Sequence, residues 1–120
     1  MAKFSSLRTV FALATKHDLK LYQMDVKAAY LNADLKEDLY MEAPPGFKIP
    51  EGHVLKLKKG VYGMKQGGRI WYEDMRGTLS ELGYTCTEAD HTIFVCPLDG
   101  IPNIITLYVD DMGLILESLE

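Results

Sequence analysis

Two adjacent aspartates, Asp110 and Asp111, are the residues of this chain best suited to chemistry, because they lie between two apolar runs, 104–109 and 112–116. Apolar runs of this length on both sides of a polar break predict two paired strands joined by a turn, with the carboxylates at its tip. A carboxylate between apolar strands is unfavourable without a compensating charge, so the pattern predicts a cation nearby. Mg²⁺ is the natural candidate, since it prefers oxygen ligands and is commonly held by one or two carboxylates and substrate phosphates.

The same pair also has a simpler interpretation as an ordinary turn. Aspartate tolerates turn geometry and bonds to nearby backbone, so Asp-Asp is common where a chain reverses direction. On the tetrapeptide 108–111 alone, both interpretations stay open. A metal-binding role for the pair requires further polar groups beside this hairpin, so the elements elsewhere in the chain distinguish the two interpretations.

A third carboxylate, Asp25, ends a stretch in which apolar and polar residues alternate, 19–26. Such alternation predicts a half-buried strand. Small residues then lead to Tyr30, so we expect a compact turn beside an aromatic ring. Both residues also have a purely structural interpretation. Asp25 could cap a short helical turn, and Tyr30 could be an ordinary core aromatic.

The rest of the pattern predicts helices, strands and turns around these residues. Apolar residues at three- and four-residue spacing predict a packing helix from Phe4 to His17, with Ser5 or Ser6 as its cap. A second helix is expected at 70–82, ended by Gly83 in the left-handed conformation. The other expected elements are a loop at 32–37, a short strand at 39–42, turns at 43–46, 50–52 and 97–100, and strands at 53–57 and 92–95.

The stretch 58–69 holds four glycines and lies within a region, 52–72, that has cations but no acidic residue. A glycine-rich loop that opens a helix offers backbone N–H groups and the positive end of the helix dipole to an anion. The loop matches neither the Walker pattern nor the dinucleotide glycine pattern. A solvated basic face is the alternative interpretation of the cations. They are Lys56, Lys58, Lys59, Lys65 and Arg69.

Composition limits the class of protein. The chain has 120 residues, 48% hydrophobic and 25% charged, which is typical of one globular domain or part of one. A net charge of −4 argues against binding nucleic acid through an overall positive field. Cys86 and Cys96 are too few for a disulfide scaffold, and their spacing from His91 matches no standard zinc site. No apolar run is long enough for a membrane span and no secretory signal is present, so we expect an intracellular protein.

Six motifs, in order, cover nearly the whole chain: QMDVKAAYLN at 23–32, YMEAPPGF at 40–47, KLKKGVYGMKQ at 56–66, RIWY at 69–72, EADH at 88–91 and YVDD at 108–111. In order and spacing they resemble the reverse transcriptases of Ty1/copia-type LTR retrotransposons. The resemblance implies an α+β fold, the palm of a right-hand polymerase with part of the fingers, in which a mostly antiparallel sheet packs on helices. Residues 1–120 would form a single partial reverse transcriptase domain without thumb, connection or RNase H.

The resemblance also implies a catalytic centre. Asp25 and Asp110 would hold two Mg²⁺ ions, for which Mn²⁺ can substitute, and Asp111 would help to position them. These three aspartates would be the catalytic residues, and the backbone carbonyl of Val26 would be a further metal ligand. The reaction would be attack of a primer 3′-hydroxyl on the α-phosphate of a deoxynucleoside triphosphate, with pyrophosphate leaving.

Other residues would bind nucleotide and nucleic acid. Tyr30 would crowd a ribose 2′-hydroxyl and so favour deoxynucleotides, and Gln66 would touch the incoming nucleotide. Lys65 and Arg69 would contact phosphates or the template. The implied partners are an RNA or DNA template with its primer, the nucleotide, and the rest of a polyprotein with integrase and RNase H, but no membrane. The implied location is the cytoplasm, within a virus-like particle, and the nucleus.

The chain departs from the family pattern at several positions. Ala33 stands where glycine is common, Gly67-Gly68 where Ala-Pro is common, and Gly60 and Gly113 where larger residues are expected. Glycine within a strand or helix weakens it, so we expect these changes to lower stability more than catalysis.

Three hypotheses follow. The first is a polymerase fragment with an intact metal site that is weakly active or inactive alone. The second is a truncated or decayed non-catalytic relic that keeps the palm fold and weak nucleic-acid binding. The third is an unrelated Mg²⁺ phosphotransferase that uses the same acidic pair.

Overall fold

The computed structural model describes residues 2–97 and 100–118, which form two compact units. Of these residues, 2–28, 75–97 and 100–118 belong to the first unit, and 29–74 belong to the second. In chain order the elements are α1 (Phe4–Lys16), β1 (Lys20–Asp25), α2 (Ala29–Asn32), β2 (Asp34–Met41), β3 (Leu55–Lys59), α3 (Gly67–Glu81), β4 (Thr85–Cys86), β5 (Ile93–Cys96), β6 (Asn103–Tyr108) and β7 (Asp111–Leu116).

The first unit is built on a five-stranded sheet with the order β1-β7-β6-β5-β4 and antiparallel pairing throughout. Directly paired residues of an antiparallel sheet share a face, so the register of β1, β7 and β6 sets three rows of side chains on one face. The rows are Leu21–Ile115–Ile104, Gln23–Gly113–Thr106 and Asp25–Asp111–Tyr108. This face therefore changes from apolar to acidic along the strands.

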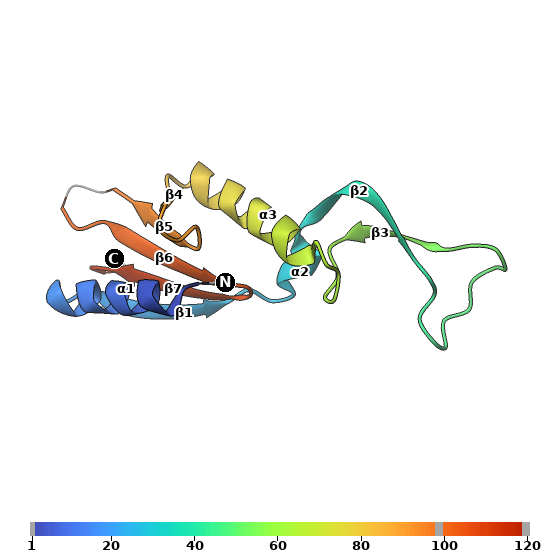
Figure 1. The fold of residues 1–120 in the computed structure, drawn as a ribbon, viewed down its shortest axis with the longest axis horizontal. Coiled ribbons are helices and arrows are strands. Elements are labelled where there is room, and N and C mark those ends of the chain that lie inside the picture. Colours follow the sequence, from blue (N-terminus) through green and yellow to red (C-terminus); the bar gives the residue numbers. More distant parts are fainter. Residues whose placement is uncertain (1, 98–99, 119–120) are drawn as a thin grey trace. The chain divides into compact units, whose positions relative to one another are not determined.

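Helix α1 covers the apolar part of this face (Figure 1). Val10 and Ala14 lie one helical turn apart, and both pack in the core cluster that includes Ile104 and Ile115. The opposite face carries Phe94, which is fully buried, and Figure 1 shows the part of α3 from Met75 on that side. The sheet therefore packs against helices on both faces where its side chains are apolar, and the face under α1 becomes polar from the second row onward.

The start of α1 differs from the expectation. Ser5 and Ser6 lie inside the helix, and the N-cap residue is Lys3, which has no capping side chain. Instead, the backbone N–H of Lys3 donates a 2.8 Å hydrogen bond to the carboxylate of Asp90, which also accepts bonds from the N–H and hydroxyl of Thr92. A buried carboxylate from the loop before β5 therefore caps the helix, a role that the local sequence does not reveal.

The second unit contains a two-stranded antiparallel sheet of β2 and β3. The loop expected at 32–37 is wrong, because β2 already begins at Asp34. Its polar side chains suit an exposed strand, since Asp34 pairs with Lys59 and Asp38 with Lys56 across the two strands. The expected turns after Met41 are present, with backbone hydrogen bonds from Phe47 N to Pro44 O and from His53 N to Pro50 O.

Helix α3 begins at Gly67, three residues before the expected start, and ends at Glu81. Gly83 follows with φ +88°, which confirms the predicted left-handed terminator. Leu98 and Asp99 of the turn expected at 97–100 lie outside the described residues. Helices and mostly antiparallel strands confirm the α+β class. Among the described residues, no helix combines the length and apolar character that crossing a bilayer requires.

Candidate active site

The hairpin between β6 and β7 turns through two residues. Tyr108 pairs with Asp111, so the tip consists of Val109 and Asp110. The prediction that both aspartates lie at the tip is therefore wrong for Asp111, which is the first residue of β7. Val109 has φ +52°, a conformation that a β-branched residue rarely adopts. The reversal is thus tight and strained beside the two carboxylates.

Strand β1 brings Asp25 to this hairpin. Asp25 is the direct cross-strand partner of Asp111, and the next residue, Val26, donates its N–H to the carbonyl of Asp110 over 2.7 Å. Hydrogen-bonded and non-hydrogen-bonded pairs alternate along an antiparallel ladder, so the neighbouring Asp25–Asp111 pair is a non-hydrogen-bonded one. In such pairs the two Cα atoms are typically only ~4.5 Å apart. Two carboxylates distant in the sequence therefore share one face at the end of the sheet.

The three aspartates differ in environment. Asp25 and Asp111 are exposed, whereas Asp110 is partly buried. One of its carboxylate oxygens, Oδ1, is shielded from solvent and accepts no hydrogen bond, although the residue has other interactions. Within residues 2–97 and 100–118, no three His, Cys, Asp or Glu side chains are grouped closely enough to form a metal site on their own.

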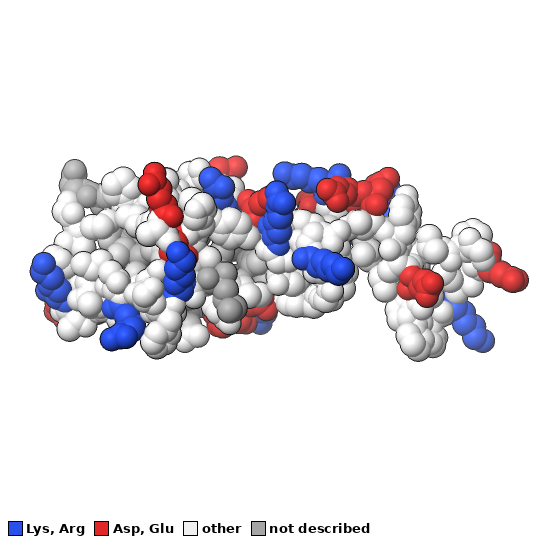
Figure 2. All heavy atoms as spheres, viewed as in Figure 1, with Lys and Arg blue, Asp and Glu red and all other residues white. Residues whose placement is uncertain are grey.

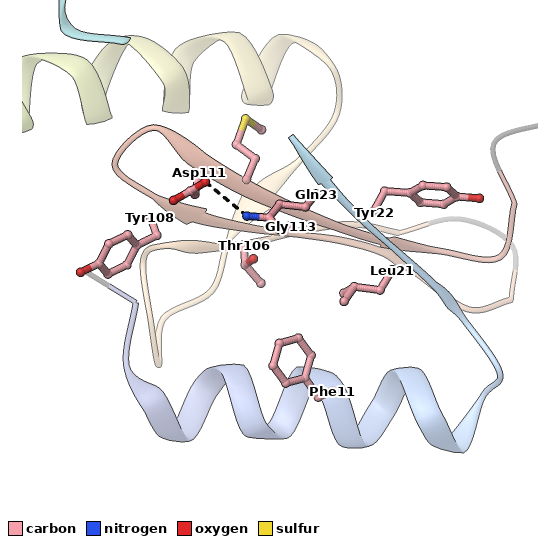
Figure 3. Close-up of a pocket in the computed structure, with 9 residues that line it drawn as sticks. Phe11, Leu21, Tyr22, Gln23, Thr106, Tyr108, Asp111 and Gly113 are labelled. Carbon is pink, nitrogen blue, oxygen red and sulfur yellow. Dashed lines mark hydrogen bonds between the residues drawn. The ribbon is translucent and has the colours of Figure 1, made fainter. Parts of the chain in front are cut away.

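Gln23 connects the acidic row to the row behind it. Its Nε2 donates a 3.3 Å hydrogen bond to Oδ1 of Asp111, and Figure 3 shows the two side chains turned toward each other. Both line a pocket of about 250 Å³ that Phe11 approaches from α1. Behind Asp111 lies Gly113, where an added Cβ would be only 2.6 Å from the Thr106 hydroxyl oxygen. Glycine at 113 therefore fits its threonine neighbour, rather than simply weakening the strand.

These donors suit Mg²⁺. Its usual ligands are carboxylate and carbonyl oxygens, and one or two carboxylates with substrate phosphates and water suffice. Asp25 and Asp111 provide two carboxylates on one face, and Asp110 is next to Asp111 in the chain, at the hairpin tip. The absence of a closed three-ligand group among the described residues is compatible with such an open site.

The second unit contains the other predicted site residues. Tyr30 lies in α2 and stacks on Tyr62, with ring centroids 4.4 Å apart and planes inclined by 21°. A Cβ at Gly60 would lie 2.6 Å from the carbonyl oxygen of Tyr30, and a Cβ at Gly68 would lie 3.2 Å from its hydroxyl. These glycines allow the backbone and the start of α3 to approach the tyrosine closely.

Gln66 directly precedes α3, and its carbonyl accepts a hydrogen bond from the Ile70 N–H. Lys65 is exposed, and Arg69 is exposed and paired with Glu73 over 2.7 Å. The hydrogen bond and charge of Glu73 raise the pKa of Arg69 above its usual value. The structure therefore places Gln66, Lys65 and Arg69 at or directly before the start of α3.

The basic stretch is partly neutralised. Three of its cations have carboxylate partners, at Asp38, Asp34 and Glu73. On the face in Figure 2, acidic and basic side chains are interspersed. Exposed ion pairs are weak, so a phosphate can replace such a partner. The stretch is thus a mixed surface, on which an anion would compete with acidic partners for three of the five cations.

Three residues that support the site or the fold around it were not among the residues predicted from the sequence. Gln23 could have been found, because it precedes Asp25 by two residues and so shares its face of the strand. Thr106 and Asp90 could not, because their importance depends on pairing and packing between distant segments.

Comparison with known proteins identifies the family. The family profile described as reverse transcriptase (RNA-dependent DNA polymerase) matches residues 1–119. The chain is 38% identical over 96% of its length to the Retrovirus-related Pol polyprotein from transposon TNT 1-94 of Nicotiana tabacum, covering 9% of that protein. It is 36% identical over 92% of its length to the Retrovirus-related Pol polyprotein from transposon RE1 of Arabidopsis thaliana, and covers 8% of that protein. It is 35% identical over 96% of its length to the Transposon Ty1-NL2 Gag-Pol polyprotein of Saccharomyces cerevisiae, and covers 6% of that protein. No solved structure matches. The chain belongs to the reverse transcriptase family and is homologous to the Pol polyproteins of Ty1/copia-type retrotransposons.

Proposed function

We propose that this chain is the catalytic palm segment, with part of the fingers, of a Ty1/copia-type polymerase that transfers nucleotides to a primer 3′-hydroxyl. The observation that carries the proposal is the direct pairing of Asp25 with Asp111, next to the Val26–Asp110 hydrogen bond. This pairing supplies carboxylates from separate strands at one sheet end, as metal-dependent phosphoryl transfer requires. Both compact units would belong to one partial reverse transcriptase domain.

The residues of the first unit would bind the metal. Asp25, Asp110 and the carbonyl of Val26 would be direct ligands, and Asp111 would complete the site from the facing strand. Two bound Mg²⁺ ions, or Mn²⁺ in their place, would make the primer hydroxyl a better nucleophile and offset charge on the leaving oxygens. Val109 would hold the hairpin tip tight, so that the carboxylates keep their places while substrate binds.

The residues of the second unit would bind the nucleotide. The Tyr30 ring would exclude a ribose 2′-hydroxyl, and its stack on Tyr62 supports this role because stacking restricts the ring. Gln66 would contact the nucleotide, and Lys65 and Arg69 would contact phosphates of nucleotide or template. Arg69 would exchange its exposed bond to Glu73 for a phosphate.

The relatives, which are Pol and Gag-Pol polyproteins, support our proposal for the partners and the location. We expect an RNA or DNA template with primer, deoxynucleotides and the remaining polyprotein segments, including integrase and RNase H, in the cytoplasm within a virus-like particle and in the nucleus. Because the chain spans no more than 9% of these relatives, we expect weak or no polymerisation by the chain alone. Primer extension with Mg²⁺ tests this, and robust processive synthesis would refute the expected incompleteness.

A second candidate is a non-catalytic relic that keeps the fold. The observation in its favour is that no three potential ligands are grouped among the described residues. The two candidates differ in metal binding: the aspartates would hold the metal ions in a polymerase fragment, whereas in a relic they would not contribute to metal binding.

Mn²⁺ titration followed by electron paramagnetic resonance separates the two candidates. We expect the unmodified chain to bind Mn²⁺ and Asp110→Asn to weaken binding at least tenfold, since it removes a ligand charge. Asp18→Asn is the matched control: it removes the same charge from an exposed turn residue with φ +50°, which asparagine tolerates. Equal affinity for all three proteins would identify a relic.

A further inference from the structure

We propose that Gln23 is a positioning residue for the metal site, whose side-chain amide holds the Asp111 carboxylate on the face of the sheet that carries Asp25. The inference rests on the proposed function and extends it to a residue outside the expected ligand set. It starts from the 3.3 Å hydrogen bond from Gln23 Nε2 to Asp111 Oδ1 (Figure 3).

The sheet register makes this contact possible. Gln23 and Asp25 lie two residues apart on β1 and therefore point to the same face. The direct partner of Gln23 on β7 is Gly113, which has no side chain. The glutamine therefore crosses the strand over this glycine and meets Asp111 diagonally, within the reach of a long side chain.

Residue 113 must be small for a second reason. Any Cβ there would come within 2.6 Å of the Thr106 hydroxyl oxygen on the other side of β7. In the row Gln23–Gly113–Thr106, the side chains of Gln23 from β1 and Thr106 from β6 therefore flank the glycine of β7 on its two sides. This links the unusual Gly113 to the support of Asp111.

Electrostatics indicate what the amide does. Asp25 and Asp111 carry like charges on directly opposed positions, which repel each other in a chain without a cation. Rotation of the exposed Asp111 carboxylate away from Asp25 would relieve this repulsion. The bond to Gln23 opposes that rotation and leaves the second oxygen of Asp111 available for a cation. At 3.3 Å the bond is long, so its effect is modest.

The test measures Mn²⁺ dissociation constants by electron paramagnetic resonance for the full chain and its variants. Gln23→Ala should weaken Mn²⁺ binding about two- to fivefold, the size expected for loss of one hydrogen bond at an exposed carboxylate. Gln23→Glu should instead tighten binding about three- to tenfold, because it adds a third carboxylate to the same face. Met24→Glu is the matched control, since it adds the same charge at the next position, which is exposed on the opposite face.

The outcomes separate the two proposals. Failure of the unmodified chain to bind Mn²⁺, or full retention of binding by Asp110→Asn, overturns the proposed function and this inference with it. Full retention of binding by Asp111→Asn refutes only the role of Gln23. If Asp111→Asn loses binding while Gln23→Ala keeps it, or if Met24→Glu tightens binding as much as Gln23→Glu, only the role of Gln23 is refuted. Thermal unfolding of each variant verifies the fold. As a readout without metal, the side-chain amide resonances of Gln23 should shift in Asp111→Asn, and unchanged resonances would contradict the contact.

Discussion

Asp25, the last residue of β1, and Asp111, the first residue of β7, lie directly opposite each other in the antiparallel register. Two exposed carboxylates are thereby placed side by side on one face. Like charges at such positions destabilise a sheet, so this arrangement is unfavourable in isolation and becomes favourable when a cation is shared. The relationship links the stability of the chain to the function that we propose.

Removing one charge of this pair should stabilise the chain when no metal is present. We expect Asp25→Asn to raise the free energy of unfolding by about 0.2–1 kcal/mol in a chelator, because it ends the cross-strand repulsion. In Mg²⁺ at about 100 times its dissociation constant, the unmodified chain should gain about 2.7 kcal/mol, and the variant should gain little. Urea unfolding with and without Mg²⁺ measures both effects. Equal Mg²⁺ gains in the two proteins would contradict a shared ion.

The strained hairpin tip gives a second prediction. Val109→Gly should raise the free energy of unfolding by about 1 kcal/mol, because glycine adopts φ +52° without the steric penalty of a β-branched side chain. The greater freedom of glycine should also loosen Asp110, so Mn²⁺ affinity should fall while stability rises. Urea unfolding and Mn²⁺ titration of the same samples test this opposition. A loss of stability would show that the valine is not strained.

The fit between Gly113 and Thr106 gives a third prediction. Gly113→Ala should lower the free energy of unfolding by about 1–3 kcal/mol, since its Cβ would lie 2.6 Å from the Thr106 hydroxyl oxygen in a packed row. In a Thr106→Ala background that oxygen is absent, and the same change should be neutral or stabilising. A double-mutant cycle by urea unfolding measures the coupling. Additive effects would show that residue 113 does not depend on Thr106.

The buried Asp90 gives a prediction for acid stability. Burial raises the pKa of its carboxyl, but hydrogen bonds from Thr92, the Lys3 N–H and Ser6 outweigh burial and place the pKa well below the usual 3.8. A lowered pKa means that this stabilisation is complete above pH 3.8 and is lost as the pH falls further. We expect Asp90→Asn to lower the free energy of unfolding by about 1–3 kcal/mol at pH 7 and to flatten its decrease below pH 4. Urea unfolding across this range measures both, and an unchanged acid slope would exclude Asp90 as its source.

The elements that the sequence predicted are those determined by local periodicity. Val10 and Ala14 mark the inner side of α1 by their spacing alone, and the apolar runs around Asp110 predicted the hairpin. The glycine after α3 was also predictable, because a left-handed terminator is a local requirement.

What the sequence did not predict depends on pairs of distant residues. The first part of β2, 34–37, was expected to be a loop because its polar side chains hide the alternation. The cross-strand ion pair of Asp38 with Lys56 becomes visible only with the register. The cap of α1 is another case, because Asp90 reaches Lys3 from another part of the chain. At the candidate site, the motif suggested that Asp25 would meet the acidic pair, but not that Asp111 would be its direct partner.

The most direct test of this partnership is a double-mutant cycle on Mn²⁺ binding, measured by electron paramagnetic resonance. The cycle compares Asp25→Asn, Asp111→Asn and the double variant with the unmodified chain, with Asp18→Asn as the charge control. If one ion is shared, each single change should remove most of the affinity and the second should add little, which gives a coupling of about 1 kcal/mol or more. Additive losses no larger than that of Asp18→Asn would show that the two carboxylates do not hold a common ion.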